Sequence, residues 1–371
     1  MRIQPFKLER FFARHEFSAP YLLCCSDCES LSVRDLLALE PGAAEALAGL
    51  WLGYTESPGS PRLRQAIASL YIGIDPEQIL VHTGAEEAIF NFMNAVLRPG
   101  DHVIVHWPCY QSLTEVAESV GCQVTRWVTR VEEGWALDTG WLRGAIRSNT
   151  RAIVVNCPHN PTGYLMNRET LGQIDAIARE HGLIVFSDEV YRFLEYDPAH
   201  RLPAFCDVSD TAVSLGVMSK SFGLAGLRIG WIATRNRQVY EPLATFKDYT
   251  TICNPAPSEF LAELALRHRE PIVARNLGII RRNLRLLDGF FARYPALFRW
   301  QRPKAGPVAF PALADGRDVE RFCEELGHTA GVLLAPGSLF DHPGSHFRLG
   351  FGRANMPECL ERLEEAVAAL N

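Results

Sequence analysis

The chain has 371 residues, of which 47% are hydrophobic and 22% charged, values typical of a folded enzyme with one large and one smaller domain. Its formal net charge of -6 offers no basic surface for a phosphate backbone, so we expect no nucleic-acid partner. It contains no apolar run of the roughly 18 residues that cross a membrane and no signal-peptide block, so we expect a cytoplasmic protein without a membrane partner.

Short runs rich in valine and isoleucine alternate with amphipathic helical patterns in the first two thirds of the chain. Such runs, without alternating polar residues, are typical of strands that helices cover on both faces. We therefore expect an α/β fold in which a mostly parallel sheet is sandwiched by helices. The expected strands are Ile79–Thr83, Asp101–Val105, Ala152–Asn156, Leu183–Phe186, Val213–Gly216 and Leu227–Ile232, and the expected helices between them include Glu87–Leu97 and Ser112–Val120.

The remaining patterns predict the domain organisation. A long helical stretch covers Pro257–Tyr294, and the residues after it alternate between strand and helix patterns. We expect a large domain at 41–294 and a smaller α+β domain at 295–371. The N-terminal segment 1–40 is expected to join the small domain.

The ten cysteines, in a long chain without a secretion signal, are expected to be reduced thiols. The spacing Cys25-x-x-Cys28 could suit a redox pair or half of a zinc site. No second pair and no His-x-His cluster completes four ligands, so we expect no metal.

Polar and aromatic residues follow several expected strands, at the sheet edge where ligands gather in open α/β folds. Small residues and free N–H groups that open a helix favour an anion such as phosphate. These residues are Gly84, Ala85 and Glu86 after the first strand, Tyr110 after the second, Asn160 in the PHNPTG turn after the third, and Asp188 and Tyr191 after the fourth. Each alone has an ordinary interpretation as a loop or core residue, and His159 in the same turn is expected to be structural.

The stretch VMSKSFGLAGLRIG places Lys220 and Arg228 eight residues apart among small, hydroxylated and apolar residues. A lysine in a dry pocket has a lowered pKa and becomes a nucleophile toward a carbonyl. Pyridoxal phosphate is the one ligand that uses the whole set: Lys220 would form a Schiff base with its aldehyde, and Asp188 would pair with its ring nitrogen. Asn160 and Tyr191 would hydrogen-bond to its phenolic oxygen, and Arg228 would bind its phosphate. We expect Lys220, Asp188 and Tyr191 to be catalytic.

The motifs also occur in the order of a known family. The chain resembles fold-type I pyridoxal-phosphate enzymes of the class I/II aminotransferase group over nearly its whole length, which implies amino-acid and keto-acid substrates. The motifs are Gly53-Tyr54, Pro61-x-Leu-Arg64, Gly84–Ala88, Pro108–Tyr110, Asn160–Gly163, Asp188–Tyr191, Ser219-Lys220 with Arg228, and Phe347–Gly350. The resemblance implies that Tyr110 stacks on the cofactor ring and that Arg348 binds the substrate α-carboxylate. It also implies a homodimer in which Tyr54 reaches the phosphate of the neighbouring subunit's cofactor.

Two departures from the family pattern matter. Val217 stands where a serine or threonine usually donates to the phosphate, so Ser219 and the backbone at Ala85 and Glu86 are expected to make that contact. The segment Leu22–Ser30, which in this family lines the substrate pocket, lacks the usual glycine-proline pattern.

Substrate specificity therefore depends on residues particular to this chain. We expect Glu9, Cys28 and Asp248 to bind substrate together with Asn160 and Arg348. The carboxylates of Glu9 and Asp248 favour a polar or cationic side chain, because a buried cation needs a paired anion. Further candidate carboxylates are Glu16, Asp27 and Glu29, and each of the five is also interpretable as a solvated surface charge.

A closer resemblance, to the capreomycidine synthase group, is carried by Leu8–Phe12, Pro158-His159, Lys220–Arg228 and Asp248–Thr250. It implies cyclisation of a hydroxylated arginine that begins with loss of the same Cα proton. An aminotransferase acting on an L-amino acid and a cyclase or lyase therefore both stay open. A regulator that uses the fold as a sensor would need a DNA-binding module ahead of it, and we do not expect one.

Overall fold

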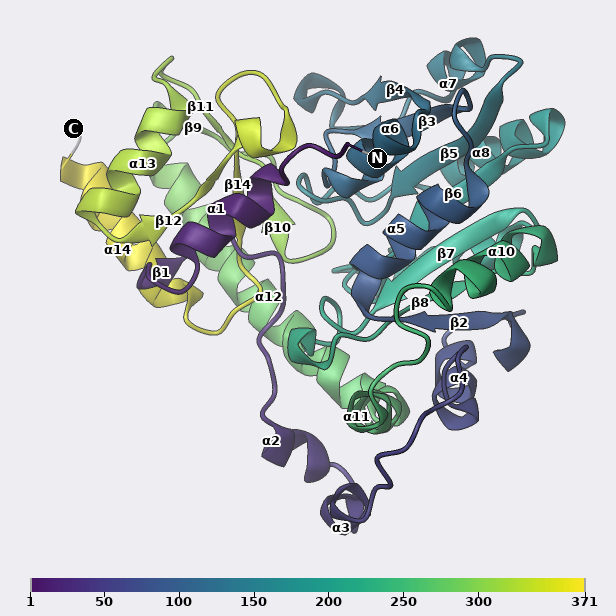
Figure 1. Ribbon diagram of the computed structural model, residues 1–371. Helices are drawn as coiled ribbons and strands as arrows, with labels where there is room; N and C mark the ends of the chain where they lie inside the picture. Colours follow the sequence, from purple (N-terminus) through teal and green to yellow (C-terminus); the bar gives the residue numbers. More distant parts are fainter. Residues whose placement is uncertain (1, 370–371) are drawn as a thin grey trace.

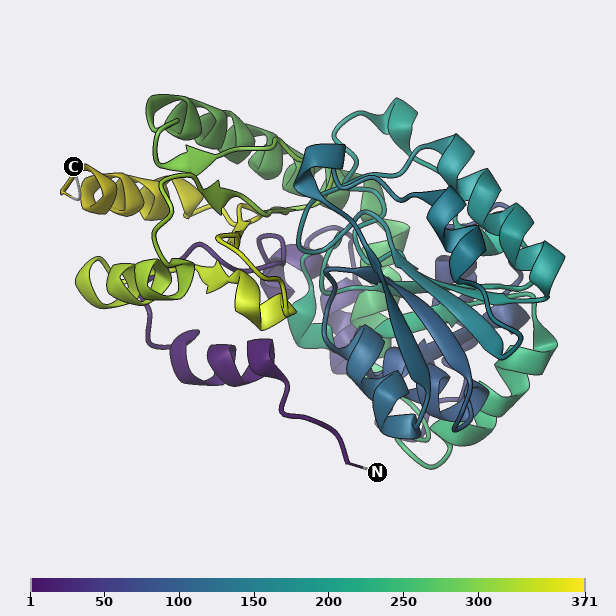
Figure 2. The same ribbon diagram turned by 90° about the horizontal axis from the view of Figure 1, so that it is seen from above.

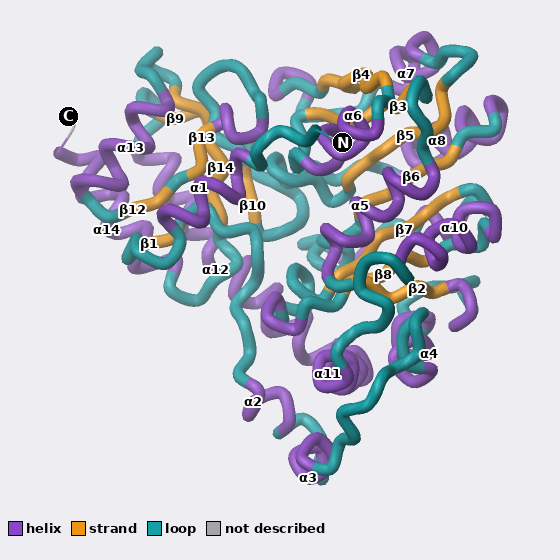
Figure 3. Tube along the Cα trace, viewed as in Figure 1, coloured by secondary structure: helices purple, strands orange, loops and turns teal. Residues whose placement is uncertain are grey.

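The computed structural model describes residues 2–369, and at its centre lies a seven-stranded sheet of order β2-β8-β7-β6-β5-β3-β4 (Figure 1, Figure 3). Neighbouring strands from β7 to β4 run parallel, whereas β8 is antiparallel to both β7 and β2. The sheet thus has the mostly parallel α/β architecture expected from the sequence. Its strands are β2 (Ile79–His82), β3 (His102–Trp107), β4 (Gln123–Val128), β5 (Thr150–Asn156), β6 (Ile184–Asp188), β7 (Ala212–Val217) and β8 (Gly230–Ala233).

Helices cover both faces of this sheet (Figure 2). Successive residues of β5 show why its sequence is apolar throughout: Ala152 and Val154 pack into one core cluster, and Ile153 and Val155 into another on the opposite face. The larger helices around the sheet are α4 (Pro61–Ala68), α5 (Gly84–Val96), α6 (Ser112–Val120), α7 (Thr139–Ala145), α8 (Arg168–His181), α10 (Arg237–Lys247) and α11 (Ala256–Arg267). None of the helices within residues 2–369 is long and apolar enough to cross a membrane.

The long helical stretch expected at Pro257–Tyr294 consists of two helices, α11 and α12 (Arg269–Arg293), which are separated at His268. Pro271 lies in the first turn of α12, where a missing N–H is tolerated. In a continuous helix its ring would clash with the carbonyl of Arg267, which explains the break.

The two ends of the chain meet in one part of the molecule. Strand β1 (Tyr21–Leu22) pairs in parallel with β12 (Val332–Leu333), and α1 (Lys7–His15) lies beside these elements in Figure 1. Helix α1 and strand β1 thus lie with the C-terminal part, whereas Leu36 of the same segment packs in a core cluster with Leu63 and Leu261; the domain bounds 1–40, 41–294 and 295–371 stay a prediction. The remaining elements are α2 (Val33–Leu37), α3 (Ala43–Ala48), α9 (Phe205–Val208), β9 (Phe298–Arg299), β10 (Val308–Ala309), β11 (Ala312–Leu313), α13 (Val319–Thr329), β13 (Ala335–Pro336), β14 (Phe347–Gly350) and α14 (Met356–Ala369).

Candidate active site

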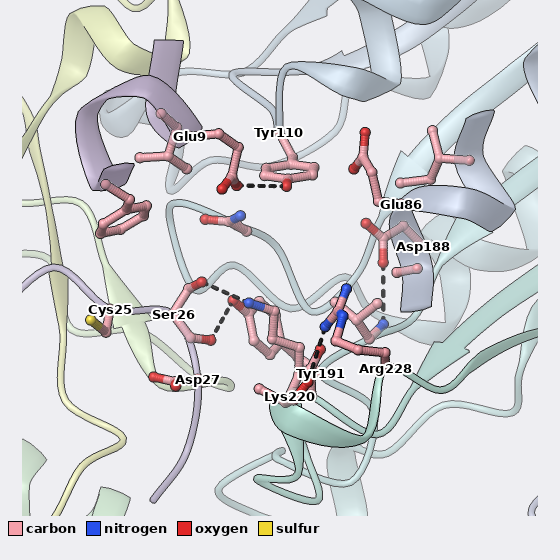
Figure 4. Close-up of a pocket in the computed structure, with 18 of the residues that line it drawn as sticks. Glu9, Cys25, Ser26, Asp27, Glu86, Tyr110, Asp188, Tyr191, Lys220 and Arg228 are labelled. Atoms are coloured by element: carbon pink, nitrogen blue, oxygen red, sulfur yellow. Dashed lines mark hydrogen bonds between the residues drawn. The ribbon is translucent and has the colours of Figure 1, made fainter. Parts of the chain in front are cut away.

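A cavity of about 380 Å³ lies beyond the carboxyl ends of β5, β6 and β7 (Figure 4). Asn156 and Asp188 are register partners at the ends of β5 and β6, so the turns that follow these strands emerge side by side. The N-terminal segment closes the opposite wall. Ten of the residues singled out in the sequence line this one cavity: Glu9, Ala85, Glu86, Tyr110, Asn160, Asp188, Tyr191, Ser219, Lys220 and Arg228.

Lys220 lies at the base of the cavity, three residues after Val217, the last residue of β7. Its Nζ donates a hydrogen bond to the Ser26 hydroxyl at 2.8 Å. Burial lowers the pKa of the Lys220 amine, Asp27 partly opposes that shift, and the nearby cation Arg348 adds to it. The amine is therefore closer to its neutral, nucleophilic form than an exposed lysine would be.

Asp188 is a buried carboxylate aimed into the same space. Within the described part of the chain, its side chain accepts one hydrogen bond, from the Val190 backbone N–H at 3.2 Å. Burial raises its pKa to about 7, and the charge of Lys220 opposes that shift. The carboxylate thus retains lone pairs for a cationic partner. Tyr191, on the same turn, is fully buried and donates its hydroxyl proton to the Ser26 carbonyl at 2.9 Å.

Arg228 and the first turn of α5 form the end of the cavity that suits an anion. Arg228 adopts a left-handed backbone conformation with a φ of 53°, and its Nη1 donates to the Ala225 carbonyl at 3.0 Å. Gly84 is buried beneath the guanidinium, and a Cβ on Gly84 would lie 2.6 Å from the Arg228 Nη2. Only glycine leaves room for this approach. The backbone of Ala85 and Glu86 continues from Gly84 along the cavity wall.

The cavity also carries several carboxylates. The Tyr110 hydroxyl donates to Glu9 at 3.0 Å, and the Ser112 hydroxyl donates to Glu86 at 3.1 Å. Burial raises the pKa of Glu86 to about 7, with Glu9 and Asp188 as further acidic neighbours. Glu86 was predicted only for its backbone, yet Figure 4 shows its side chain lying close to Asp188 in the cavity.

The structure brings in residues that the sequence did not single out. Ser26 connects the N-terminal segment with Lys220, as described above. Arg353, five residues after Arg348, lines the cavity and forms a two-pronged ion pair with Asp27, at 3.0 and 2.9 Å. Two of the candidate carboxylates named from the sequence also line the cavity: Asp27, and Glu16, which lies 3.9 Å from Arg353. A second arginine close behind the first in the FRLGFGR stretch is the one sequence signal that could have drawn attention to Arg353.

Arg348 lies behind the wall formed by Asn160 and is fully buried. Its Nη1 donates to the Asn160 Oδ1 at 3.2 Å, and its Nε and Nη2 donate to the Cys24 carbonyl at 3.1 and 2.8 Å. An arginine has five N–H donors, so these three contacts leave two N–H groups for a further acceptor.

Several predicted site residues do not line this cavity: Gly84 and Arg348, described above, and Cys28, Asp248 and Tyr54. Cys28 is wrongly placed by the prediction, because it packs in the main hydrophobic core, whereas Cys25, Ser26 and Asp27 line the cavity. Asp248 ends α10 at the surface, where it accepts a hydrogen bond from the Ser57 hydroxyl at 2.9 Å, so the expectation that it approaches this cavity is not met within one chain.

Tyr54 is 86% exposed on the segment between α3 and α4. Its predicted partner is the cofactor of a neighbouring subunit, and a single chain leaves that role untested. Glu29 does not line the cavity either. Its carboxylate accepts a hydrogen bond from the Ala354 N–H at 2.7 Å.

The family model described as aminotransferase class I and II matches residues 24–370. This chain belongs to that family. It is 30% identical to capreomycidine synthase of Streptomyces vinaceus over 98% of this chain and 92% of that protein. It is 32% identical to the aspartate/prephenate aminotransferase of Thermus thermophilus over 87% of this chain and 86% of that protein. The crystal structure of a PLP-dependent aminotransferase from Streptococcus suis matches it with a TM-score of 0.94 and 35% identity, covering 100% of this chain and 99% of that chain.

The cofactor of this class I and II aminotransferase family is pyridoxal 5′-phosphate, and the cavity fits it chemically. A lysine with a lowered pKa, Lys220, suits an aldehyde, and the buried Asp188 carboxylate suits a protonated ring nitrogen. The close approach of Arg228 to Gly84 suits a phosphate at the start of α5. The expected fold, enzyme class and cofactor are thereby confirmed.

Proposed function

We propose that the protein is an aminotransferase that takes the amino group from a polar or cationic L-amino acid and passes it to a keto acid. The observation that carries the proposal is the placement of Lys220 and Asp188 in one cavity. Asp188 is buried there and Lys220 is half-buried, and loss of hydration raises the pKa of Asp188 and lowers that of Lys220, so that the neutral form of each is favoured. A cytoplasmic location belongs to the same proposal.

Pyridoxal phosphate, when bound, supplies an aldehyde that condenses with amines and a ring that accepts electrons when a Cα–H bond breaks. Asp188 would hold a proton on the ring nitrogen, and Asn160 and Tyr191 would hydrogen-bond to the phenolic oxygen. Lys220 Nζ, once neutral, would take the proton from the substrate Cα and deliver it to the carbon that was the aldehyde of the cofactor. Burial supports this role, because a general base must be largely unprotonated near the working pH.

The remaining contacts orient the cofactor and substrate. Arg228, Ser219 and the backbone of Ala85 and Glu86 would bind the phosphate, and Tyr110 would stack on the ring. The two free N–H groups of Arg348 would bind the α-carboxylate, a group whose two oxygens match an arginine fork.

The charge of the cavity supports a polar or cationic side chain on the substrate. Five carboxylates line it, against three cationic side chains, and one of these cations is already paired with Asp27. The carboxylates are Glu9, Glu16, Asp27, Glu86 and Asp188. Desolvating a cation costs free energy, and a wall of carboxylates offsets that cost because paired acceptors are already in place.

A half-reaction with single amino acids tests the proposal. The purified holoenzyme is mixed with one amino acid at a time, without a keto acid, and the products are followed by absorbance and mass spectrometry. We expect pyridoxamine phosphate and the matching keto acid to accumulate in equal amounts, fastest with arginine-like or other cationic amino acids. A profile that favours aromatic or aliphatic amino acids would contradict the proposed substrate class.

The same assay on Glu9→Gln isolates the charge of Glu9, because glutamine keeps an oxygen that can accept from Tyr110. We expect the preference for cationic over neutral amino acids to fall by about tenfold, equal to about 1.4 kcal/mol. Glu29→Gln is the matched control on the same segment, since Glu29 bonds to the Ala354 N–H. An equal loss of rate toward cationic and neutral amino acids would remove Glu9 from substrate recognition.

A second candidate function is a cyclase or lyase of the capreomycidine synthase type, acting on a hydroxylated arginine. The 30% identity to that synthase over 98% of the chain favours it. It needs the same Cα proton transfer by Lys220, so the site residues do not separate the two. In the half-reaction above, a dehydrated or cyclised product with the cofactor still in its aldehyde form would select this function.

We further propose a homodimer in which Tyr54 completes the phosphate contacts of the other subunit. Trp51 and Leu52 beside it are 79% and 77% exposed, a density of large apolar side chains typical of interaction surfaces. Tyr54→Phe, which removes only the hydroxyl, should weaken cofactor binding several-fold without changing the sedimentation of a dimer. A fully active monomer in sedimentation would contradict the proposal.

A further inference from the structure

A polar cluster on the outer side of the proposed phosphate seat has no part in the chemistry described so far. At its centre is Glu87, on the first turn of α5, directly after the residues that face Arg228. The Glu87 side chain is 10% exposed, and its carboxylate accepts three hydrogen bonds. Oε2 accepts the Thr83 backbone N–H at 2.5 Å, and Oε1 accepts the hydroxyls of Thr250 at 2.6 Å and Thr251 at 2.7 Å.

These contacts replace the usual cap of the helix. Thr83 is the N-cap residue of α5, yet its side chain makes no capping hydrogen bond. Glu87 instead takes the Thr83 N–H, as the second half of a capping box would. The turn 83–86 includes Gly84 in a left-handed conformation with a φ of 78°. Side chains hold this turn: Glu87 accepts the Thr83 N–H, and Asn254 donates to the Thr83 hydroxyl at 3.2 Å.

The loop that bears the two threonines is itself held in one shape. It joins α10 to α11, and the buried Lys247 closes it from below by donating from Nζ to the Ile252 carbonyl at 2.9 Å. Ile252 has a φ of 62°, a left-handed conformation that is strained for a β-branched residue. Such a conformation persists only where surrounding contacts impose it. The loop is therefore a fixed anchor for Glu87.

Glu87 stays charged in this environment. Burial alone would raise its pKa, but the hydrogen bonds from Thr250, Thr251 and Thr83 outweigh it, so that the pKa lies below its ordinary value. His82, whose ring lies 3.8 Å from the carboxylate, is kept neutral because burial lowers its pKa to about 3. Hydrogen bonds to an ionised acceptor are roughly twice as strong as neutral ones, so the charged Glu87 holds the turn and the loop together more firmly than a neutral side chain would.

We propose that Glu87 is a positioning residue for the cofactor phosphate: it fixes the turn 83–86 against the loop 248–254, so that the Ala85 and Glu86 backbone faces Arg228. The inference rests on the phosphate seat of the proposed function. Glu87 touches neither the phosphate nor the substrate. Its effect reaches the seat through the Thr83 N–H and the first turn of α5.

The test compares two ligands that differ only in the phosphate. Pyridoxal phosphate and pyridoxal carry the same aldehyde for Lys220, so a variant that changes the ratio of their dissociation constants relative to wild type has changed the phosphate contacts. In spectral titrations of cofactor-stripped protein, Glu87→Gln should weaken pyridoxal phosphate binding by about tenfold or more and leave pyridoxal within about twofold. If the variant lost affinity for neither ligand, or lost equal affinity for both, the positioning role of Glu87 would be overturned. General destabilisation would not weaken the binding of one ligand only.

Two further variants keep this result interpretable. Thr250→Val with Thr251→Val removes only the loop donors and should give a smaller shift of the same kind; it carries the test if Glu87→Gln does not fold. Glu270→Gln, a first-turn carboxylate at the exposed start of α12, is the control and should change neither constant. A wild-type protein that shows no preference for the phosphate would contradict the seat itself, whereas a wild-type preference that survives in the variants contradicts only the role of Glu87.

Discussion

Replacing Lys220 with alanine should reduce turnover by at least about 10³-fold, because one side chain is proposed to bind the cofactor covalently and to carry the Cα proton. The variant should still bind pyridoxal phosphate, since Arg228, Asp188 and the start of α5 are unchanged. Turnover is measured with the best amino acid from the half-reaction, and bound cofactor is measured after borohydride reduction and gel filtration in denaturant. We expect the reduced cofactor to stay on the wild-type protein and to be released from the variant.

Lys304→Ala is the control for this experiment, because Lys304 is an exposed lysine on a loop of the C-terminal part. It should behave as wild type in both assays. A Lys220→Ala enzyme that retains more than about a tenth of wild-type turnover would exclude Lys220 as the essential base, since loss of such a group costs at least about 10²-fold.

Asp188→Asn should give the second large loss. Asparagine keeps the shape of the side chain but removes the negative charge proposed to hold the ring nitrogen protonated. Removing one partner of a buried charged pair costs about 3–5 kcal/mol, so turnover should fall by about 10² to 10³-fold. The rate of Cα–deuterium exchange should fall in parallel, because the electron sink is weakened at that step. A variant within about tenfold of wild type would mean that another group faces the nitrogen.

Asp188 also predicts a pH dependence in cofactor-stripped protein. Burial raises its pKa from 3.8 to about 7, so the folded chain binds the proton more tightly than the unfolded chain does. Its favourable contribution is therefore present in full below about pH 4 and is lost as the pH rises toward 7. Asp188→Asn should gain stability over wild type across that window, on the order of a few kcal/mol in denaturant titrations. If the difference in free energy of unfolding between Asp188→Asn and wild type stayed constant from pH 4 to 8, the raised pKa of Asp188 would be contradicted.

The residues at strand ends were predictable because local pattern determines them. Parallel strands place their carboxyl ends at one edge of the sheet, so recognising the strands was enough to bring Asn160, Asp188 and Lys220 together. The residue patterns did not show that β8 runs antiparallel to β7. The connection between them, residues 218–229, contains only a short helical turn. A parallel crossover needs a longer connection, usually with a full helix.

Other parts of the structure depend on tertiary contacts that local pattern does not encode. Strand β4 was missed because it lies at the sheet edge and is largely exposed, with glutamine, threonine and arginine among its six residues. Ser26 and Cys28 lie in an irregular segment whose path is set by pairing with the C-terminal part. Without a regular period, the sequence did not reveal that Ser26 faces Lys220 and Cys28 faces the core.

Chemical mapping of the cofactor attachment tests the central claim most directly. Borohydride reduction of the holoenzyme, followed by proteolysis and mass spectrometry, locates the pyridoxyl group on one lysine. Lys247 is the strongest competitor, because burial lowers the pKa of its amine as well. It is held by the Ile252 carbonyl and lies outside the cavity, so we predict the label on Lys220 alone. A label on Lys247 or Lys304 would contradict the assignment of the active site.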